Sequence, residues 1–189
     1  CEKSIAENRA LGMSHVPEDR HLDGSAPEMS VRDNLIAASL TRLSKKAILD
    51  TAAIEEYCAS CVRDFKVKTA SLDISIKSLS GGNIQKAIVA REFTAGADVI
   101  VLNQPTRGVD VGAMEFIHKK ILDMREEKKS LILVSADLAE LKALSDRIIV
   151  FHQGRVAGVL SDVPNVTEEE LGLYMLGLKH DPKEILEEA

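Results

Sequence analysis

Three short, uninterrupted apolar runs constrain the fold of this chain more strongly than any other feature of its sequence. Because none of them alternates apolar with polar residues, each run is typical of a strand that is buried on both faces of a sheet. Segments with helical periodicity precede the first run and separate the three, and such alternation indicates a parallel sheet. The sequence therefore predicts an α/β fold with a mainly parallel sheet flanked by helices. The predicted strands are residues 98–102, 130–135 and 147–151, and the predicted helices are residues 84–95, 113–128 and 138–144.

Composition excludes several functional classes. The 189 residues are 45% hydrophobic, which suffices for a core, and 24 Lys and Arg against 30 Asp and Glu give a net charge of −6. An acidic chain without Trp does not fit a general nucleic-acid binder, which uses basic surfaces and aromatic stacking. The apolar runs are too short to cross a bilayer as helices, and we expect no signal peptide.

The segment before the first strand predicts a second part of the molecule. Residues 31–71 have no strand pattern, and we expect helices that begin near Ser30 and near Ser44. This helical block interrupts the α/β pattern as an insert. The predicted organisation is an α/β core of residues 1–18 and 72–160, a helical subdomain of residues 19–71, and a C-terminal helix and tail of residues 161–189.

The C-terminal part carries local turn and capping signals. A turn at Gln153–Gly154 predicts a small hairpin with residues 155–160 as its second strand. Thr167 and Glu170 have the spacing of a capping box at the start of the last helix. The charged segment after Gly177 predicts a frayed tail.

The three cysteines do not form a disulfide framework. Cys58 and Cys61 form a C-x-x-C pair, which is found in redox sites and in half of a zinc site. No second ligand pair stands at zinc-site spacing, so we interpret the two as ordinary thiols of an amphipathic helix over 48–62. Cys1 stands where Met is expected, and we interpret it as a cut point; the first residue of a mature lipoprotein is the less favoured alternative.

Residues 79–86, Leu-Ser-Gly-Gly-Asn-Ile-Gln-Lys, carry the clearest chemical signal. Gly81 and Gly82 allow the backbone to approach a ligand closely, and the helix that follows offers unpaired N–H groups and the positive end of its dipole. The hydroxyl of Ser80 adds a donor. This combination predicts a corner that binds phosphate, although a Ser-Gly-Gly helix start alone is a weak signal.

The order of motifs along the chain strengthens this prediction. An apolar run at 99–102 ends in Asn103 and Gln104 before the turn 105–110, and a later run ends in Ser-Ala-Asp at 135–137. This order resembles the nucleotide-binding domains of ABC (ATP-binding cassette) transporters over about residues 5–178. In that resemblance the three segments match the family's signature, its Walker B strand with the D-loop, and its switch-histidine strand.

Variant residues narrow the resemblance to one branch. Residues 17–20 (Pro-Glu-Asp-Arg) stand at the Q-loop, residues 79–83 form an LSGGN signature, and residues 105–113 read Pro-Thr-Arg-Gly-Val-Asp-Val-Gly-Ala. These sequences are similar to the second cassette of sugar and nucleoside importers, in which two cassettes are fused. The family's P-loop, G-x-x-x-x-G-K-[ST], does not occur in the sequence.

The resemblance implies a degenerate catalytic half-site. The Walker B carboxylates, which hold Mg²⁺ and act as the base, are replaced by Asn103 and Gln104. A neutral amide cannot accept a proton from the attacking water as a carboxylate does. Ala136 stands at the switch histidine and Glu18 at the Q-loop glutamine. We therefore expect no intact catalytic residue and no metal ligand set in this chain.

The signature, in contrast, is complete. The resemblance implies that it contacts ATP held by a partner cassette, that Asp110 in the D-loop contacts the partner or simply caps the following helix, and that residues 30–71 receive the permease. It also implies ATP and Mg²⁺ in the full assembly, neither held tightly by this chain, and a peripheral location on the cytoplasmic face of the bacterial plasma membrane. A solute-binding protein is an indirect partner, and no nucleic acid is expected. The expected signature contacts are Leu79, Ser80, Gly81, Gly82, Asn83 and Gln85.

Two alternatives belong to other functional classes. A nucleotide-independent interaction domain on an ABC scaffold would have no need of the intact signature. A nucleic-acid-associated ABC ATPase would show long heptad repeats or basic patches, which this acidic sequence lacks. We therefore rank the importer subunit first and the interaction domain second.

Overall fold

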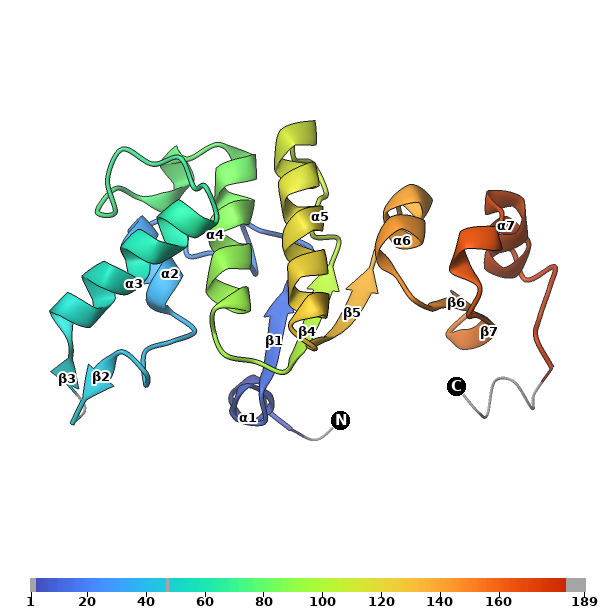
Figure 1. Cartoon of the computed structure of the whole chain (residues 1–189), viewed down its shortest axis with the longest axis horizontal. Coiled ribbons are helices and arrows are strands. Elements are labelled where there is room, and N and C mark those ends of the chain that lie inside the picture. Colours follow the sequence, from blue (N-terminus) through green and yellow to red (C-terminus); the bar gives the residue numbers. More distant parts are fainter. Residues whose placement is uncertain (1–2, 47, 183–189) are drawn as a thin grey trace. The chain divides into compact units, whose positions relative to one another are not determined.

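The computed structural model describes residues 3–46 and 48–182 (Figure 1). Contacts divide the chain into two compact units, Cys1–Val134 and Ser135–Ala189. Each unit is described by itself below. The expectations for Cys1 and for the end of the tail, residues 183–189, lie outside the described residues.

A three-stranded parallel sheet forms the centre of the first unit. Its strand order is β1–β4–β5, built from Met13–Val16, Val99–Asn103 and Ser130–Val134. Met13 pairs with Val99, and Val99 with Ser130. Strands β4 and β5 confirm two of the predicted strands, whereas β1 was not predicted, because its four residues include Ser14 and His15 and give no apolar run.

Helices α4 (Gly81–Phe93) and α5 (Val111–Glu126) cover one face of this sheet (Figure 1). The residues that point towards them, including Val16, Ile100 and Leu102, are completely or almost completely buried. Helix α1 (Ile5–Ala10) precedes β1 and begins with a capping box formed by Ser4 and Glu7. The burial of this one face explains why the apolar runs form strands here.

The opposite face of the sheet is open, which corrects the prediction that the strands are buried on both faces. In β5 the exposed residues alternate with half-buried ones, and the side chains of Ile132 and Val134 are about half exposed, at 53% and 49%. Among the described residues, helices cover only the side of α4 and α5. The continuous apolar pattern of β4 and β5 is typical of strands buried on both faces, but in this chain only one face of these strands is buried.

The helical block differs from the prediction at one position. Helix α2 (Val31–Ile36) begins at the expected N-cap, Ser30, and α3 (Thr51–Asp64) contains the C-x-x-C pair. Near Ser44, however, the chain forms a short antiparallel hairpin, β2 (Ser44–Lys45) and β3 (Ile48–Leu49), instead of a helix. Lys46 has a φ of 50°, which is a left-handed turn conformation that a helix does not contain.

The second unit holds a correction to the sheet. Strand β6 (Ile148–His152) was predicted to be parallel, but it pairs antiparallel with β7 (Arg155–Leu160) in a separate two-stranded sheet. The predicted hairpin is thus confirmed, and β6 is its first strand. Helix α6 (Leu138–Leu144) and helix α7 (Glu168–Met175) complete this unit, and its core consists of Ile148, Val150, Ala157, Leu160, Val163, Val166, Leu171 and Tyr174.

Residues 178–182 are tied down, which corrects the predicted frayed tail over this part. The backbone of Asp181 donates to the carbonyl of Ala157 at 2.8 Å, and its carboxylate accepts from the N–H of Val159 at 2.8 Å. The Tyr174 hydroxyl donates to the same carboxylate at 2.5 Å. One side chain therefore fastens the tail to the edge of β7. The Thr167 hydroxyl caps α7 by accepting from the N–H of Glu170, while the Glu170 carboxylate binds Lys179.

The open sheet face predicts that the isolated chain self-associates. Ile132→Lys should weaken this association and leave the fold intact, because the side chain is exposed and a charge blocks edge and face pairing. Ile100→Lys is the matched control on the neighbouring strand: this side chain is 1% exposed on the covered face, and the change should cost more than about 3 kcal/mol. Sedimentation and thermal unfolding measure both effects, and a monomeric wild-type chain would contradict the prediction.

Candidate functional site

The first turn of α4 forms a set of unpaired hydrogen-bond donors. Ser80 is the N-cap residue, but its side chain makes no capping hydrogen bond to the helix. Gly81 and Gly82 occupy the first two helical positions, and no acceptor for their N–H groups occurs among the described residues. An exposed hydroxyl and two free N–H groups at the positive end of a helix dipole are suited to a phosphate oxygen.

The side chain of Asn83 links this turn to the segment after α3. Its Nδ2 donates to Oγ of Ser80 at 2.8 Å, and its Oδ1 accepts from the backbone N–H of Lys68 at 2.9 Å. A hollow of about 570 Å³, open to solvent, lies between this segment and the signature. Its lining includes Val67, Lys68, Thr69, Leu79, Ser80 and Asn83.

Gln85, predicted as a ligand contact, points into the protein. Its side chain is 3% exposed, and its Nε2 donates to the carbonyl of Pro105 at 2.8 Å. The amide therefore fixes the turn after β4 against α4. Leu79 is half-buried in extended backbone just before the helix.

The first turns of α4 and α5 approach each other at Gly82. A Cβ atom on Gly82 would lie 2.9 Å from Oδ2 of Asp110 and 3.3 Å from Cβ of Ala113. Asp110 is the N-cap of α5, and its Oδ1 accepts from the N–H of Ala113 at 2.9 Å. The capping role considered for Asp110 is thus present, and its carboxylate lies beside the signature glycines at the same time.

Arg20 holds the signature to the turn after β4. It donates to the carbonyls of Arg107 at 2.7 Å and Gly108 at 3.2 Å, and its guanidinium lies 3.1 Å from the position of a Cβ on Gly81. Its Nε is buried and has no partner among the described residues. No local sequence pattern indicates these contacts, because they join residues more than 60 positions apart.

Glu18 and Asp19 occupy the loop that leads to Arg20. Glu18 is exposed and forms an ion pair with Arg107. The Asp19 carboxylate accepts from the N–H groups of Leu22 and His21, and these bonds lower the pKa of Asp19 below its ordinary value. Glu18 is therefore engaged with the turn after β4 within the first unit.

Asn103 and Gln104 stand at the carboxyl end of β4, where ligands bind in parallel α/β folds. Asn103 pairs with Val134 in the sheet register. Gln104 has a φ of 51° and donates its backbone N–H to the carbonyl of Val134 at 2.8 Å. Ala136 lies in the other unit, exposed just before the N-cap of α6, Asp137, so its position relative to Gln104 is not defined.

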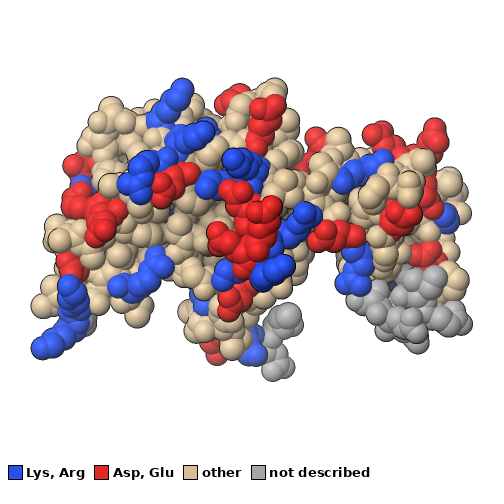
Figure 2. Space-filling view, in the orientation of Figure 1, with Lys and Arg blue, Asp and Glu red and all other residues tan. Residues whose placement is uncertain are grey.

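The residues fit a phosphate better than a metal ion. Within residues 3–46 and 48–182, no group of three His, Cys, Asp or Glu side chains is placed to hold a metal ion. The donors at the start of α4 are N–H and O–H groups, which bind anions. On the face shown in Figure 2, basic and acidic side chains are interspersed.

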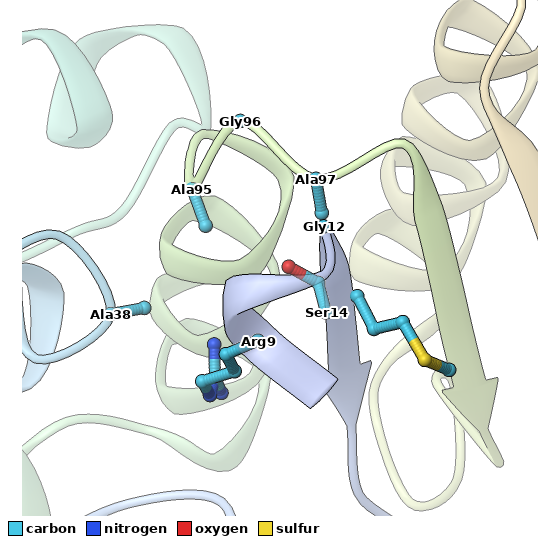
Figure 3. A pocket seen from close by; sticks show the side chains of 8 residues that line it. Arg9, Gly12, Ser14, Ala38, Ala95, Gly96 and Ala97 are labelled. Atoms are coloured by element: carbon cyan, nitrogen blue, oxygen red, sulfur yellow. The ribbon is translucent and has the colours of Figure 1, made fainter. Parts of the chain in front are cut away.

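A second hollow lies at the other end of the strands. Arg9, Ser14 and the backbone of residues 95–97 line it beside the start of β1 (Figure 3). Its volume of about 60 Å³ is far below the several hundred Å³ that organic ligands need. Next to it, the fully buried carboxylate of Glu92 binds Arg9 at 3.0 Å and Arg91 at 2.7 Å, so the charge here is structural.

The C-x-x-C pair lies inside the helical block. Cys58 and Cys61 are free, buried thiols on the inner face of α3. Burial, reinforced by the neighbouring Cys61, raises the pKa of the Cys58 thiol to about 11, and burial also raises the pKa of Cys61. Protonated, enclosed thiols are poor nucleophiles, which agrees with their interpretation as ordinary core residues.

Comparison with curated proteins finds import ATP-binding proteins among the relatives of this chain. The chain is 42% identical over 167 residues to the nucleoside import ATP-binding protein NupA of Lactococcus lactis subsp. cremoris, covering 87% of the chain and 33% of that protein. It is 37% identical to the guanosine import ATP-binding protein NupO of Bacillus subtilis, and the match covers 88% of the chain and 33% of that protein. It is 38% identical to the xylose import ATP-binding protein XylG of Escherichia coli K12, with 95% and 34% covered. The chain thus spans about a third of the length of these relatives, and no protein-family model matches it.

Solved structures agree on the fold. A metal-chelate type ABC transporter in an inward-facing conformation superposes with a TM-score of 0.70 at 17% identity, covering 87% of this chain and 64% of that one. A dimeric ATP-binding cassette bound to ADP and Pi gives 0.69 at 17% identity, with 85% and 68% covered. The fold predicted from the sequence, an ABC-type α/β core, is therefore confirmed. No helix among the described residues has the length and apolarity to span a membrane.

The buried thiols predict a loss of stability at alkaline pH. Because folding raises the pKa of Cys58 from about 9 to about 11, the folded state favours the neutral thiol. The free energy of unfolding is therefore insensitive to this group below pH 9 and falls by about 2 kcal/mol between pH 9 and 11. Urea unfolding at several pH values measures this loss.

Cys58→Ala is the control for the alkaline loss, since other groups titrate in the same range. The variant should be less stable at pH 7 and lose less stability than the wild type above pH 9. Equal losses in the two proteins would contradict the role of the thiol.

Proposed function

Because this chain is homologous to the sugar- and nucleoside-import ATP-binding proteins and has the fold of an ABC ATPase domain, we propose that it serves in the ATP-binding subunit of an ABC importer. In this role its signature completes the ATP site of a partner cassette. Its own Walker B and switch positions support no turnover.

The donor set at the start of α4 carries this proposal. A γ-phosphate presented by the partner would meet the Ser80 hydroxyl and the N–H groups of Gly81 and Gly82, none of which donates a hydrogen bond to another of the described residues. Leu79 places the turn in extended backbone before the helix, and Asn83 supports Ser80 from the side. Hydrogen bonds from N–H and O–H groups to a charged phosphate are about twice as strong as neutral ones, so these donors suffice for recognition.

Charge and side-chain chemistry favour an inactive half-site in the same chain. Asn103 and Gln104 end β4 with two neutral amides, and neither supplies the negative charge that attracts Mg²⁺ or the base that accepts a proton from water. Ala136 has only a methyl side chain, which cannot donate a hydrogen bond to a phosphate, and Glu18 is paired with Arg107. We propose that this chain contributes binding contacts, with chemistry carried out on the partner.

The cofactors and partners follow from the same proposal. ATP with Mg²⁺ binds in the assembly, where Mg²⁺ neutralises phosphate charge; this chain supplies Ser80, Gly81, Gly82 and the nearby Asp110, and no metal ligand. The partners are another cassette and a membrane permease that docks on the helical subdomain, residues 19–71. This chain would lie at the cytoplasmic face of the bacterial plasma membrane, and a solute-binding protein would be an indirect partner that acts through the permease.

Simple sugars or nucleosides are the proposed cargo. The named relatives import nucleosides, guanosine and xylose, and the relative of highest identity among the three is the nucleoside importer. Selection among cargoes would take place in the permease, since the signature contacts only phosphate.

Two substitutions test the asymmetry. In the assembled transporter, Ser80→Arg should abolish ATP-driven uptake, because it removes the hydroxyl and fills the phosphate position with a long side chain. Gln104→Asn should change uptake by no more than about twofold, since it keeps a neutral amide at a half-buried position that carries no catalytic charge. Asparagine is chosen because it tolerates the φ of 51° that alanine would strain. Uptake of radiolabelled cargo and ATP hydrolysis are the measurements.

Each outcome separates two functions. Loss of uptake in both variants would mean that Gln104 takes part in turnover and would refute the inactive half-site. Normal uptake with Ser80→Arg would refute the signature role and would favour an interaction domain that no longer uses nucleotide.

A further inference from the structure

The orientation of the Asn83 amide is fixed by its neighbours. The backbone N–H of Lys68 is only a donor, so the atom that faces it at 2.9 Å must be the Oδ1 acceptor. The Nδ2 group therefore faces Ser80 and donates to its Oγ at 2.8 Å. The Asn83 side chain thus accepts a hydrogen bond on one side and donates a hydrogen bond on the other.

This arrangement controls the hydroxyl of Ser80. Its oxygen already accepts a hydrogen bond from Asn83, so the hydroxyl proton cannot point towards that amide. The hydroxyl has no acceptor among the residues that the structure describes and makes no cap to α4. The residue is exposed, so its O–H is left to donate outward, on the side where the N–H groups of Gly81 and Gly82 are also unpaired.

We propose that Asn83 is a positioning residue that keeps the Ser80 hydroxyl oriented as a donor to a bound phosphate. The inference rests on the proposed function, in which that phosphate is the γ-phosphate of ATP. Asn83 acts in this proposal through Ser80: its Oδ1 is held by Lys68, and one N–H of its Nδ2 group is held by Ser80.

The same contact joins the signature to the segment after α3. Lys68 is separated from Asn83 by 15 positions and lies with Thr69 along the open hollow beside the signature. A shift of this segment would withdraw the acceptor Oδ1 from Lys68 and release the amide to rotate. The donor direction of Ser80 therefore depends on a segment that belongs to the helical subdomain and not to the α/β core.

Asn83→Asp separates positioning from simple structural support. Its Oδ1 still accepts from Lys68, but its second oxygen can only accept, so the Ser80 hydroxyl turns inward to donate to it. An aspartate in the first turn also interacts favourably with the helix dipole. The substitution should therefore leave the melting temperature of the chain unchanged or higher, while kcat/KM for ATP in the assembled transporter falls.

A double-mutant cycle in the assembled transporter gives the test. Asn83→Asp should lower kcat/KM for ATP roughly ten- to a hundredfold, because a charge-assisted hydrogen bond is lost. In the Ser80→Ala background the same change should cost no more than about threefold, since there is no hydroxyl left to reverse. Asn83→Ala removes both hydrogen bonds without adding charge or reversing the hydroxyl, and should lower kcat/KM less than Asn83→Asp.

The outcomes are distinct. If Asn83→Asp lowers kcat/KM by the same factor with Ser80 and with Ser80→Ala, the loss comes from repulsion between the new carboxylate and ATP. This result would overturn the inference. A fall in melting temperature that parallels the fall in kcat/KM would assign Asn83 to stability alone and would also overturn it. If Ser80→Ala by itself leaves kcat/KM unchanged, the proposed function fails first, and the inference that rests on it fails with it.

Discussion

The close approach of two helix N-termini at Gly82 is the contact on which the site depends. The first turns of α4 and α5 both present the positive end of a helix dipole, and these ends repel each other. Asp110 resolves the conflict, because its carboxylate caps α5 through Ala113 and its Oδ2 lies only 2.9 Å from the position that a Cβ on Gly82 would take. The negative charge between the two turns offsets the repulsion, and the absence of a side chain on Gly82 makes the approach possible.

The two signature glycines are therefore required for different physical reasons. Gly82 admits Asp110 and Ala113 from α5, whereas Gly81 leaves space for the guanidinium of Arg20. Any larger residue at either position would disturb packing before a ligand arrives. A Ser-Gly-Gly helix start can thus be a packing motif and a phosphate site at once, and the unpaired N–H groups distinguish the second role from the first.

Local patterns in the sequence predicted the local features of the structure. Apolar runs predicted β4 and β5, and capping residues predicted the starts of α2 and α7. The Gly-rich turn indicated the start of α4, which lies at Gly81 and not at Ile84. What the sequence did not predict depends on distant partners: the pairing of β1 with β4, the contacts of Arg20 with the turn after β4, and the hydrogen bonds that hold Asp181 to β7. The inward position of Gln85 was missed for the same reason, because its partner, the carbonyl of Pro105, carries no sequence signal.

The phosphate site is built almost entirely from backbone and hydroxyl groups, and this determines what it can do alone. Such donors bind a phosphate through hydrogen bonds of fixed direction. They therefore need an anion that another surface holds in place. The strand end beside them offers only the neutral amides Asn103 and Gln104, and the sheet behind them has one uncovered face with Ile132 and Val134 exposed. A chain that is open on its sheet and neutral at its strand end gains both affinity and stability from a partner surface. In the proposed function this geometry is one half of a shared site, and the direction of the Ser80 hydroxyl is then a property that the fold has to control.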